Sequence, residues 1–273
     1  MTSKPAFDFL VRPPRAAKPR KRGLTVVSDK AKSLAQARDC IETVSDIVDH
    51  MKIPDHVGVM WRYPEELIRS KNALYAQAGI HTLPGGIPFE VAAVQGRIPE
   101  YMQRTAELGF GGVEVSEDSV DLGPGDRVNA IKRAIAAGLI VFTELGKKFP
   151  DRPLDAEDAI EMANRDLEAG AYLVVVEKSD VALAIKQGTD ALHRLMRGVG
   201  PERLIIECGP GADRFEIAKW LLKEFGPEVN LENVDADDAY IIEAMRHGLH
   251  RATDYDYFHA YRGMKLPPVP PLP

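Results

Sequence analysis

The sequence has 273 residues, of which 45% are hydrophobic and 28% are charged, a balance typical of a globular protein with room for one large core. No apolar run approaches the roughly 18–20 residues of a membrane-spanning helix, which excludes an integral membrane protein. The formal net charge of −6 argues against a nucleic-acid-binding chain, and two cysteines are too few for a disulfide scaffold. The N-terminal residues also lack the apolar segment that a secretory signal needs. We therefore predict a cytoplasmic protein without nucleic-acid or membrane partners.

The two ends of the chain differ from its middle. Residues 1–22 carry seven basic side chains against one acid, together with four prolines, which predicts a mobile basic arm. Residues 264–273 are proline-rich and predict a disordered, polyproline-type tail. The intervening residues 23–263 match the size of one (β/α)8 barrel.

Short apolar runs alternate with longer amphipathic stretches through the middle of the chain. This pattern is typical of parallel strands joined by crossover helices. The runs cover 24–28, 56–61, 79–84, 112–116, 139–145, 172–177, 204–208 and 229–234. Because eight such units recur and no GxGxxG motif follows the first run, we predict a single-domain α/β fold, a (β/α)8 TIM barrel, over an open doubly wound sheet.

Acidic residues mark the carboxyl ends of the predicted strands, where the active site of such a barrel forms. Four strands end at or near a glutamate: Glu114, Glu144, Glu177 and Glu207. Neighbouring carboxylates repel each other unless they are protonated, paired with lysines, or bound to a cation. Hard oxygen donors without a histidine cluster favour Mg²⁺ over Zn²⁺. We therefore predict a magnesium site at two or three of these glutamates; for any single one, pairing with Lys30, Lys147 or Lys148 is the alternative.

Lys148 shares its strand parity with Glu144, so an extended backbone would place the two side chains on the same side. A lysine beside a metal carboxylate can protonate a carbanion, form a Schiff base, or neutralise the acid. The spacing alone leaves these three roles open.

Glycine-rich turns follow the third and seventh predicted strands. Gly85 and Gly86 lie in the first turn, and Gly209 and Gly211 in the second, which precedes a helix. Backbone amides in such turns can bind phosphate, although glycine and proline also simply make turns. Asn230, in the last predicted strand, is a further candidate for substrate binding.

Several segments, in order and over nearly the whole core, resemble the phosphosulfolactate synthase family, which includes heat-stress-associated plant relatives. The segments are RGLTVVSDK (22–30), GIHTLPGGIPFE (79–90), LGFGGVEVSEDSVDL (108–122), NAIKRAIAAGLIVFTELGKKFPD (129–151), LEAGAYLVVVE (167–177), FGPEVNLENV (225–234) and MRHGLH (245–250). The resemblance implies a barrel enzyme, a carbon–sulfur lyase that adds sulfite to phosphoenolpyruvate with Mg²⁺ as cofactor. The product would be (2R)-phospho-3-sulfolactate, in a route to coenzyme M.

The resemblance also implies roles for individual residues. Lys148, the second lysine of the GKK motif after Lys147, would protonate the carbanion formed when sulfite attacks. Arg22 and Lys30, from the RGLTVV-DK motif, would neutralise phosphate or sulfite. Glu90, after the PGG turn, would orient a lysine or join the metal shell.

Two segments depart from the family pattern. The lysine that the family commonly carries in strand two is expected at Gly58, and 177–188 replaces a glycine-arginine-glutamate-serine-glycine segment. Two alternatives follow: a relative that uses another nucleophile on phosphoenolpyruvate or a similar acid, and a non-catalytic protein of the heat-stress type. Relatives form homo-oligomers, so we expect an oligomer.

Overall fold

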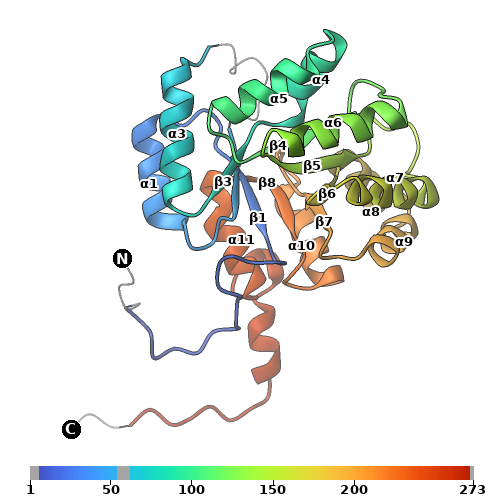
Figure 1. Ribbon diagram of the computed structural model, residues 1–273. Helices are drawn as coiled ribbons and strands as arrows, with labels where there is room; N and C mark the ends of the chain where they lie inside the picture. The colour runs from blue at the N-terminus through green and yellow to red at the C-terminus, as the bar shows by residue number, and fades with distance from the viewer. Residues whose placement is uncertain (1–5, 54–61, 271–273) are drawn as a thin grey trace.

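The computed structural model describes residues 6–53 and 62–270, and its described part is a nearly closed parallel barrel surrounded by helices (Figure 1). Eight strands lie in these ranges: β1 Thr25–Ser28, β2 His50–Lys52, β3 His81–Leu83, β4 Gly112–Val115, β5 Ile140–Leu145, β6 Leu173–Val176, β7 Leu204–Glu207 and β8 Leu231–Asp235. The sheet order is β3-β2-β1-β8-β7-β6-β5-β4, and every ladder is parallel. Between the two outer strands, Gly111 N donates to Thr82 O at 3.0 Å, so the sheet comes close to closing on itself. The predicted (β/α)8 TIM barrel is confirmed.

The second strand lies earlier in the sequence than predicted. The predicted run 56–61 falls outside the described residues, and the strand that pairs with both β1 and β3 is His50–Lys52. This strand contains no β-branched residue and carries a histidine and a lysine, so hydrophobicity alone does not mark it. Strand two therefore does carry a lysine, Lys52; Gly58, where the resemblance placed the family's lysine, lies outside the described residues.

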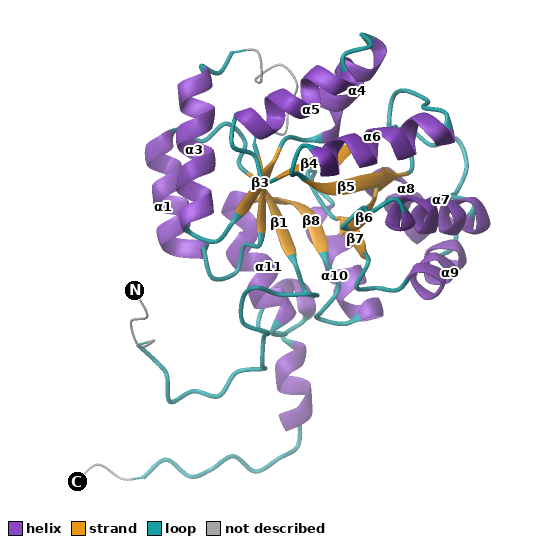
Figure 2. Cartoon of the chain, viewed as in Figure 1, coloured by secondary structure: helices purple, strands orange, loops and turns teal. Residues whose placement is uncertain are grey.

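Helices cover the outside of the barrel (Figure 2). Those in the described ranges are α1 Leu34–Val44, α3 Glu65–Gln77, α4 Gly86–Val94, α5 Ile98–Glu107, α6 Pro124–Ala136, α7 Ala156–Glu168, α8 Lys178–Gln187, α9 Asp190–Val199, α10 Arg214–Phe225 and α11 Ala239–Arg246. Local sequence explains their ends: Asp155, for example, caps α7 by accepting from Glu157 N at 2.9 Å and Asp158 N at 3.2 Å. No helix in the described ranges is long and apolar enough to cross a membrane.

Strand alternation explains why the acidic residues gather at one end of the barrel. The barrel is filled by a buried apolar cluster that includes Phe142, Val175 and Ile205. Two residues further along each of these strands, on the same side, lie Glu144, Glu177 and Glu207. The apolar cluster thus forms a floor, and the glutamates stand above it at the carboxyl ends of the strands, which we call the mouth.

The opposite end of the barrel is covered by the N-terminal arm. Arg15 Nε lies 3.0 Å from Glu243 Oε1 of α11, and Arg20 Nη1 lies 3.1 Å from Asp49 Oδ1. Lys18 Nζ donates to Ser45 O at 2.9 Å. Arg15, Lys18 and Arg20 thus attach residues 15–20 of the arm to the barrel, because these side chains reach buried or half-buried oxygen acceptors. Residues 264–270 form neither helix nor strand and are exposed.

Candidate active site

A cavity of about 380 Å³ opens at the mouth of the barrel. The N-termini of α4 and α8 border it: the start of α4 has no side-chain cap, whereas in α8 Lys178 N donates to Glu207 Oε2 at 3.3 Å and Ser179 N to Glu177 Oε1 at 3.2 Å. Its charged lining residues are Lys52, Glu114, Asp118, Glu144, Lys148, Glu177, Lys178 and Glu207. A cavity with this lining suits a small, highly charged substrate rather than a nonpolar one.

Lys52 lies at the centre of a buried group of acids. Its Nζ is 2.7 Å from Glu114 Oε2, 3.2 Å from Glu232 Oε1 and 3.6 Å from Glu207 Oε1. Burial alone would lower the pKa of Lys52, but these carboxylates hold it well above the ordinary lysine value. The lysine is therefore charged and partly neutralises three of the acids around it.

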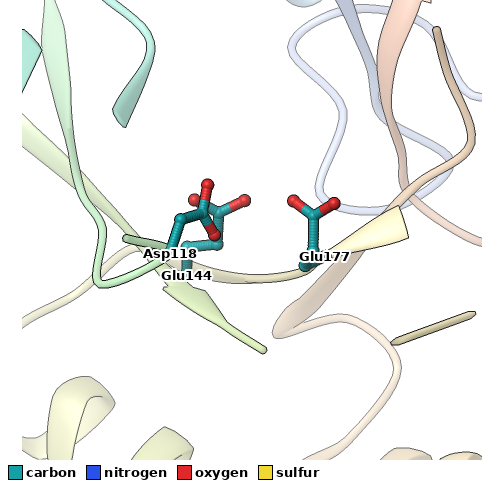
Figure 3. A group of neighbouring side chains, drawn as sticks. All are labelled: Asp118, Glu144 and Glu177. Carbon is teal, nitrogen blue, oxygen red and sulfur yellow. The ribbon is translucent and has the colours of Figure 1, made fainter. Parts of the chain in front are cut away.

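A second group of acids lies beside the first and has room for a metal ion. Asp118, from the loop after β4, Glu144 at the end of β5 and Glu177 directly after β6 each offer a carboxylate oxygen, and these oxygens lie within 4.8 Å of one another (Figure 3). Within the described residues, Asp118 Oδ1, Glu144 Oε2 and Glu177 Oε2 are buried and have no hydrogen-bond partner; Glu177 Oε2 has only the 3.5 Å ion pair with Lys148. Buried carboxylate oxygens without partners are costly unless they are protonated or bind a cation. The group therefore fits a hard divalent cation.

The pKa values at the mouth reflect an excess of acid over base. Burial, followed by the neighbouring acids Glu114, Glu207 and Asp118, raises the pKa of Glu144 well above its ordinary value. Burial likewise raises the pKa of Asp118 to about 6 and that of Glu232 to about 7. Glu177 is the exception: although burial opposes ionisation, Lys148 and hydrogen bonds lower its pKa. Such perturbed carboxylates in a cavity are typical of a catalytic or metal-binding centre.

Lys148 lies at the edge of this second acidic group. Its Nζ forms an ion pair with Asp118 and lies 3.5 Å from Glu177 Oε2, while 38% of the side chain remains exposed. Burial lowers the pKa of Lys148, but Glu144, Glu177 and Asp118 outweigh it and raise the pKa above the ordinary value. Lys148 is thus a protonated, partly accessible group that faces the cavity.

The other predicted lysines are not directed into the cavity. Lys147 Nζ lies 2.9 Å from Asp121 Oδ1 and donates to Glu117 O, so it holds the loop after β4 on the outer side of β5. Lys30, at the end of β1, is paired with Asp235 at the end of β8. Neither contacts the Asp118, Glu144 and Glu177 group in the described structure.

Of the predicted anion-binding residues, three line the cavity. These are Gly85, Gly86 and Gly209. Gly211 lies next to them and makes room for a lysine: a Cβ there would come within 2.5 Å of Lys178 Nζ, which donates to Pro210 O at 2.6 Å. The sequence segment 177–188 thus places Lys178 at the cavity.

Arg22 and Asn230 lie at the opposite end of the barrel from the mouth. Arg22 precedes β1, is 68% exposed, and pairs with Glu228 at 2.8 Å. Asn230 precedes β8, where its Oδ1 accepts from Leu24 N at 2.9 Å and its Nδ2 donates to Leu204 O at 2.8 Å. Asn230 therefore links the amino ends of β1, β7 and β8 by hydrogen bonds. Both residues stand before their strands, so the structure does not bring them to the substrate cavity.

The sequence analysis did not identify three charged residues of the mouth: Lys52, Asp118 and Glu232. Lys52 was missed because strand two was placed at 56–61, and Glu232 because Asn230 was taken as the candidate of strand eight. Glu232 pairs with Glu207 in the β7–β8 ladder and lies inside the barrel, 3.2 Å from Lys52 Nζ. Asp118 was missed because it lies in a loop; its signal is the SEDS segment, an acidic run directly after the fourth strand.

Glu90 has a different position from the one the resemblance implied. Its Oε1 accepts from Asp118 N at 2.8 Å and from Ser116 Oγ, and its Oε2 accepts from Ser119 N at 2.9 Å. Glu90 therefore anchors the loop that carries Asp118, and it contacts neither Lys147 nor Lys148 in these interactions.

Fold and site together define a TIM-barrel enzyme with an acidic centre at the carboxyl ends of its strands. The family described as (2R)-phospho-3-sulfolactate synthase (ComA) matches residues 13–252. The chain belongs to this phosphosulfolactate synthase family, and it is a lyase-type enzyme.

Individual relatives agree with this assignment. The chain is 32% identical to a phosphosulfolactate synthase of Methanothermobacter thermautotrophicus over 89% of this chain and 95% of the relative. It is 34% identical to one of Methanocaldococcus jannaschii over 89% and 96%. The Arabidopsis thaliana protein HEAT-STRESS-ASSOCIATED 32 is 21% identical over 88% and 91%. Among solved structures, the carboxyl transferase domain of Rhizobium etli pyruvate carboxylase shares the fold, with a TM-score of 0.55 and 14% identity over 90% of this chain and 48% of that one.

Proposed function

We propose that this enzyme adds sulfite to phosphoenolpyruvate to give (2R)-phospho-3-sulfolactate. The sulfur lone pair of sulfite forms a C–S bond with the methylene carbon, and the π electrons move to the carbon that bears phosphate and carboxylate. A proton then bonds to that carbon. The reaction needs no oxidant or reductant, because the two substrates and one proton account for all atoms and electrons of the product.

The observation that carries this proposal is the position of Lys148. It is protonated, faces the cavity, and lies against Asp118 and Glu177, two of the three carboxylates suited to a cation. Lys148 would deliver the proton from one side of the cavity, which accounts for a single product configuration. The two acids orient its ammonium group and keep it charged until the carbanion forms.

Mg²⁺ is the proposed cofactor, held by Asp118, Glu144 and Glu177. When bound, it would supply Lewis-acid stabilisation of the negative charge on the substrate carboxylate. Lys52 would keep Glu114, Glu207 and Glu232 from adding to that charge. Lys178 and the backbone amides at the start of α4 would bind the anionic ends of the substrates.

The test is phosphorus NMR of the purified protein with phosphoenolpyruvate, sulfite and Mg²⁺. A new organic phosphate should form with the wild-type chain and with Lys132→Ala, a matched change at an exposed lysine of α6, and should not form with Lys148→Ala. Product from Lys148→Ala at the wild-type rate would remove Lys148 from the proposed chemistry. No product despite Mg²⁺ binding would instead favour another nucleophile, and no product without Mg²⁺ binding would favour a non-catalytic role.

A further inference from the structure

The loop after β5 carries Lys148 but has little hydrogen bonding of its own. Residues 146–153 form neither helix nor strand, and within the described ranges they make no turn or loop hydrogen bond from backbone to backbone. A segment with few backbone hydrogen bonds opens more easily than the strands and helices around it. The position of Lys148 at the mouth therefore depends on contacts with neighbouring elements.

Asp180, in the first turn of α8, bonds this loop directly. Its Oδ2 accepts from Lys147 N at 2.9 Å, one residue before Lys148. Asp180 is only 4% exposed. Burying a carboxylate is costly unless a hydrogen-bond donor faces it, and here the amide of Lys147 is such a donor. The bond thus joins the start of α8 to the backbone that precedes the proposed proton donor.

The backbone at Gly146 makes this contact possible. Gly146 has a φ of +104°, which residues with a side chain rarely adopt. An added Cβ would collide with Asp180 Oδ2 and lie 3.0 Å from Glu177 Cβ. A side chain at position 146 would therefore take the place of the Asp180 carboxylate, so the close approach of the loop to α8 needs both residues.

The start of α8 also provides a partner for the ammonium group of Lys148. Glu177, directly before α8, has its Oε2 3.5 Å from Lys148 Nζ, and its Oε1 accepts from Ser179 N at 3.2 Å. Asp180 holds the backbone before Lys148, and Glu177 faces the end of the Lys148 side chain. Two contacts from one helix start thus fix the lysine at both ends.

Asp180 itself does not line the mouth cavity. It lines a neighbouring cavity of about 650 Å³ together with Gly146 and Lys147, whereas Lys148 lines the mouth. A carboxylate in this position has no access to a substrate in the mouth. Its effect on the reaction would therefore pass through the loop.

We propose that Asp180 is a positioning residue of this enzyme. Its carboxylate holds the amide of Lys147 and so keeps the ammonium group of Lys148 beside Asp118 and Glu177. Asp180 belongs to segment 177–188, which departs from the family pattern, so this segment supplies an anchor for the proton donor. The inference rests on the role of Lys148 in the reaction proposed above.

The kinetic test compares Asp180→Ala with Asp180→Asn. Asparagine keeps a side-chain carbonyl oxygen that can accept from Lys147 N, whereas alanine keeps no acceptor. With phosphoenolpyruvate, sulfite and Mg²⁺, Asp180→Ala should lower kcat at least about 10-fold, because it misaligns the proton donor. Both KM values should stay within about 3-fold of the wild type, because Asp180 does not line the mouth. Asp180→Asn should keep kcat within about 3-fold, since it replaces a charge-assisted hydrogen bond by a neutral one.

Hydrogen exchange of the Lys147 amide examines the loop without any substrate. Exchange should be at least about 10-fold faster in Asp180→Ala than in the wild type and should change much less in Asp180→Asn. The matched control is Asp158→Ala. Asp158 is also a first-turn acid that lines the second cavity, but in the described structure its carboxylate does not bond the loop. This variant should match the wild type in kcat and in exchange.

Three results would overturn the proposal: unchanged exchange in Asp180→Ala, wild-type kcat in a variant with faster exchange, or an Asp180→Asn chain as slow as Asp180→Ala. The last would mean that the charge of Asp180 acts rather than its hydrogen bond. Circular dichroism checks that each variant is folded. If Asp180→Ala were unfolded, Gly146→Ala should show the same faster exchange and lower kcat, because it displaces the carboxylate without removing it.

The exchange measurement separates this inference from the proposed function. If the wild-type chain formed no product, the proposed reaction would fail. The exchange rates of the Lys147 amide in the wild type, Asp180→Ala and Asp158→Ala would still decide whether Asp180 holds the loop.

Discussion

Lys52 Nζ lies 2.7 Å from Glu114 Oε2, and the two side chains are 3% and 2% exposed. An ion pair this deeply buried is destabilising to break, because the remaining charge has neither water nor a partner. Here three carboxylates share one ammonium group, since Glu207 and Glu232 also face Lys52. The lysine therefore stabilises the folded state in which these three acids are buried together at the mouth.

Replacing Lys52 with methionine should lower the free energy of unfolding by about 3–5 kcal/mol, the usual effect of breaking a buried ion pair. The loss should be larger at pH 8 than at pH 5, because burial raises the pKa values of Glu207 and Glu232, and their protonation relieves the repulsion that Lys52 no longer offsets. Urea denaturation at the two pH values measures both effects. Lys132→Met, at an exposed position of α6, should change stability by no more than about 0.5 kcal/mol. If Lys52→Met and Lys132→Met lowered the free energy of unfolding equally, Lys52 would not stabilise the buried acids.

Metal binding distinguishes the two acidic groups at the mouth. Asp118→Asn, Glu144→Gln and Glu177→Gln should each weaken Mg²⁺ binding by at least about 10-fold, since each removes a proposed ligand charge. Glu207→Gln is the matched control, because Glu207 is engaged by Lys52 and should leave the affinity within about 3-fold. Titration calorimetry with Mg²⁺ alone measures all four. If Glu207→Gln bound Mg²⁺ more weakly than Asp118→Asn, the metal site would instead lie among the acids around Lys52.

Much of this architecture follows from the sequence because short apolar runs that alternate with longer amphipathic stretches indicate parallel strands joined by helices. Glu114, Glu144, Glu177 and Glu207 were found by one argument: a carboxylate at the carboxyl end of a barrel strand faces the mouth. That argument needs only the position of each strand, and four strands were placed correctly enough for it to work.

The same argument failed where a strand was misplaced or where a side chain came from a loop. Lys52 lies on a three-residue strand with little apolar character, and a neighbouring run at 56–61 fitted the strand pattern better. Arg22 and Asn230 were taken as mouth residues although both precede their strands, so they lie at the barrel's other end. Asp118 reaches Glu144 and Glu177 only through a loop held by Glu90, and a tertiary contact of this kind has no local signal in the sequence.

The raised pKa of Glu232 predicts how the stability of the chain depends on pH. Burial raises its pKa to about 7 in the folded chain, whereas an unfolded glutamate titrates near about 4.3. Between these values the folded state binds more protons than the unfolded state, so ionisation of Glu232 costs stability as the pH rises. The difference in unfolding free energy between Glu232→Gln and the wild type should therefore shift in favour of the variant from pH 5 to pH 8.

Denaturation in the presence of a chelator measures this difference at several pH values. The control is Glu168→Gln, an exposed glutamate of α7, whose difference from the wild type should stay constant over the same range. A flat difference for Glu232→Gln would show that Lys52 already keeps Glu232 ionised at pH 5.

Arg127 is a buried cation that connects three elements beneath the site. Its guanidinium lies 2.7 Å from Asp166 Oδ2 of α7 and 2.6 Å from Glu117 Oε2, and it donates to Glu144 O at 2.9 Å. Arg127→Met should cost about 3–5 kcal/mol of stability, because it leaves Asp166 buried without its partner. Arg133→Met, on the exposed face of the same helix, should cost no more than about 0.5 kcal/mol. Thermal denaturation of both variants checks this, and similar midpoints would contradict it.

Gly86, at the first position of α4, lies so close to β4 that no side chain fits. An added Cβ would come within 2.4 Å of Ser116 Cβ and 2.7 Å of Glu114 Oε1. Gly86→Ala should therefore push α4 away from the mouth, destabilise the chain by about 1–3 kcal/mol, and reduce turnover, since Glu114 and the start of α4 line the cavity. Gly125→Ala provides the comparison: this helical glycine of α6 has no atom within 4 Å of the added Cβ, so the substitution should be neutral or stabilise by up to about 1 kcal/mol. Thermal midpoints and initial rates of both variants measure these effects. A Gly86→Ala chain with wild-type rate and stability would mean that α4 can move away from β4 without changing the cavity.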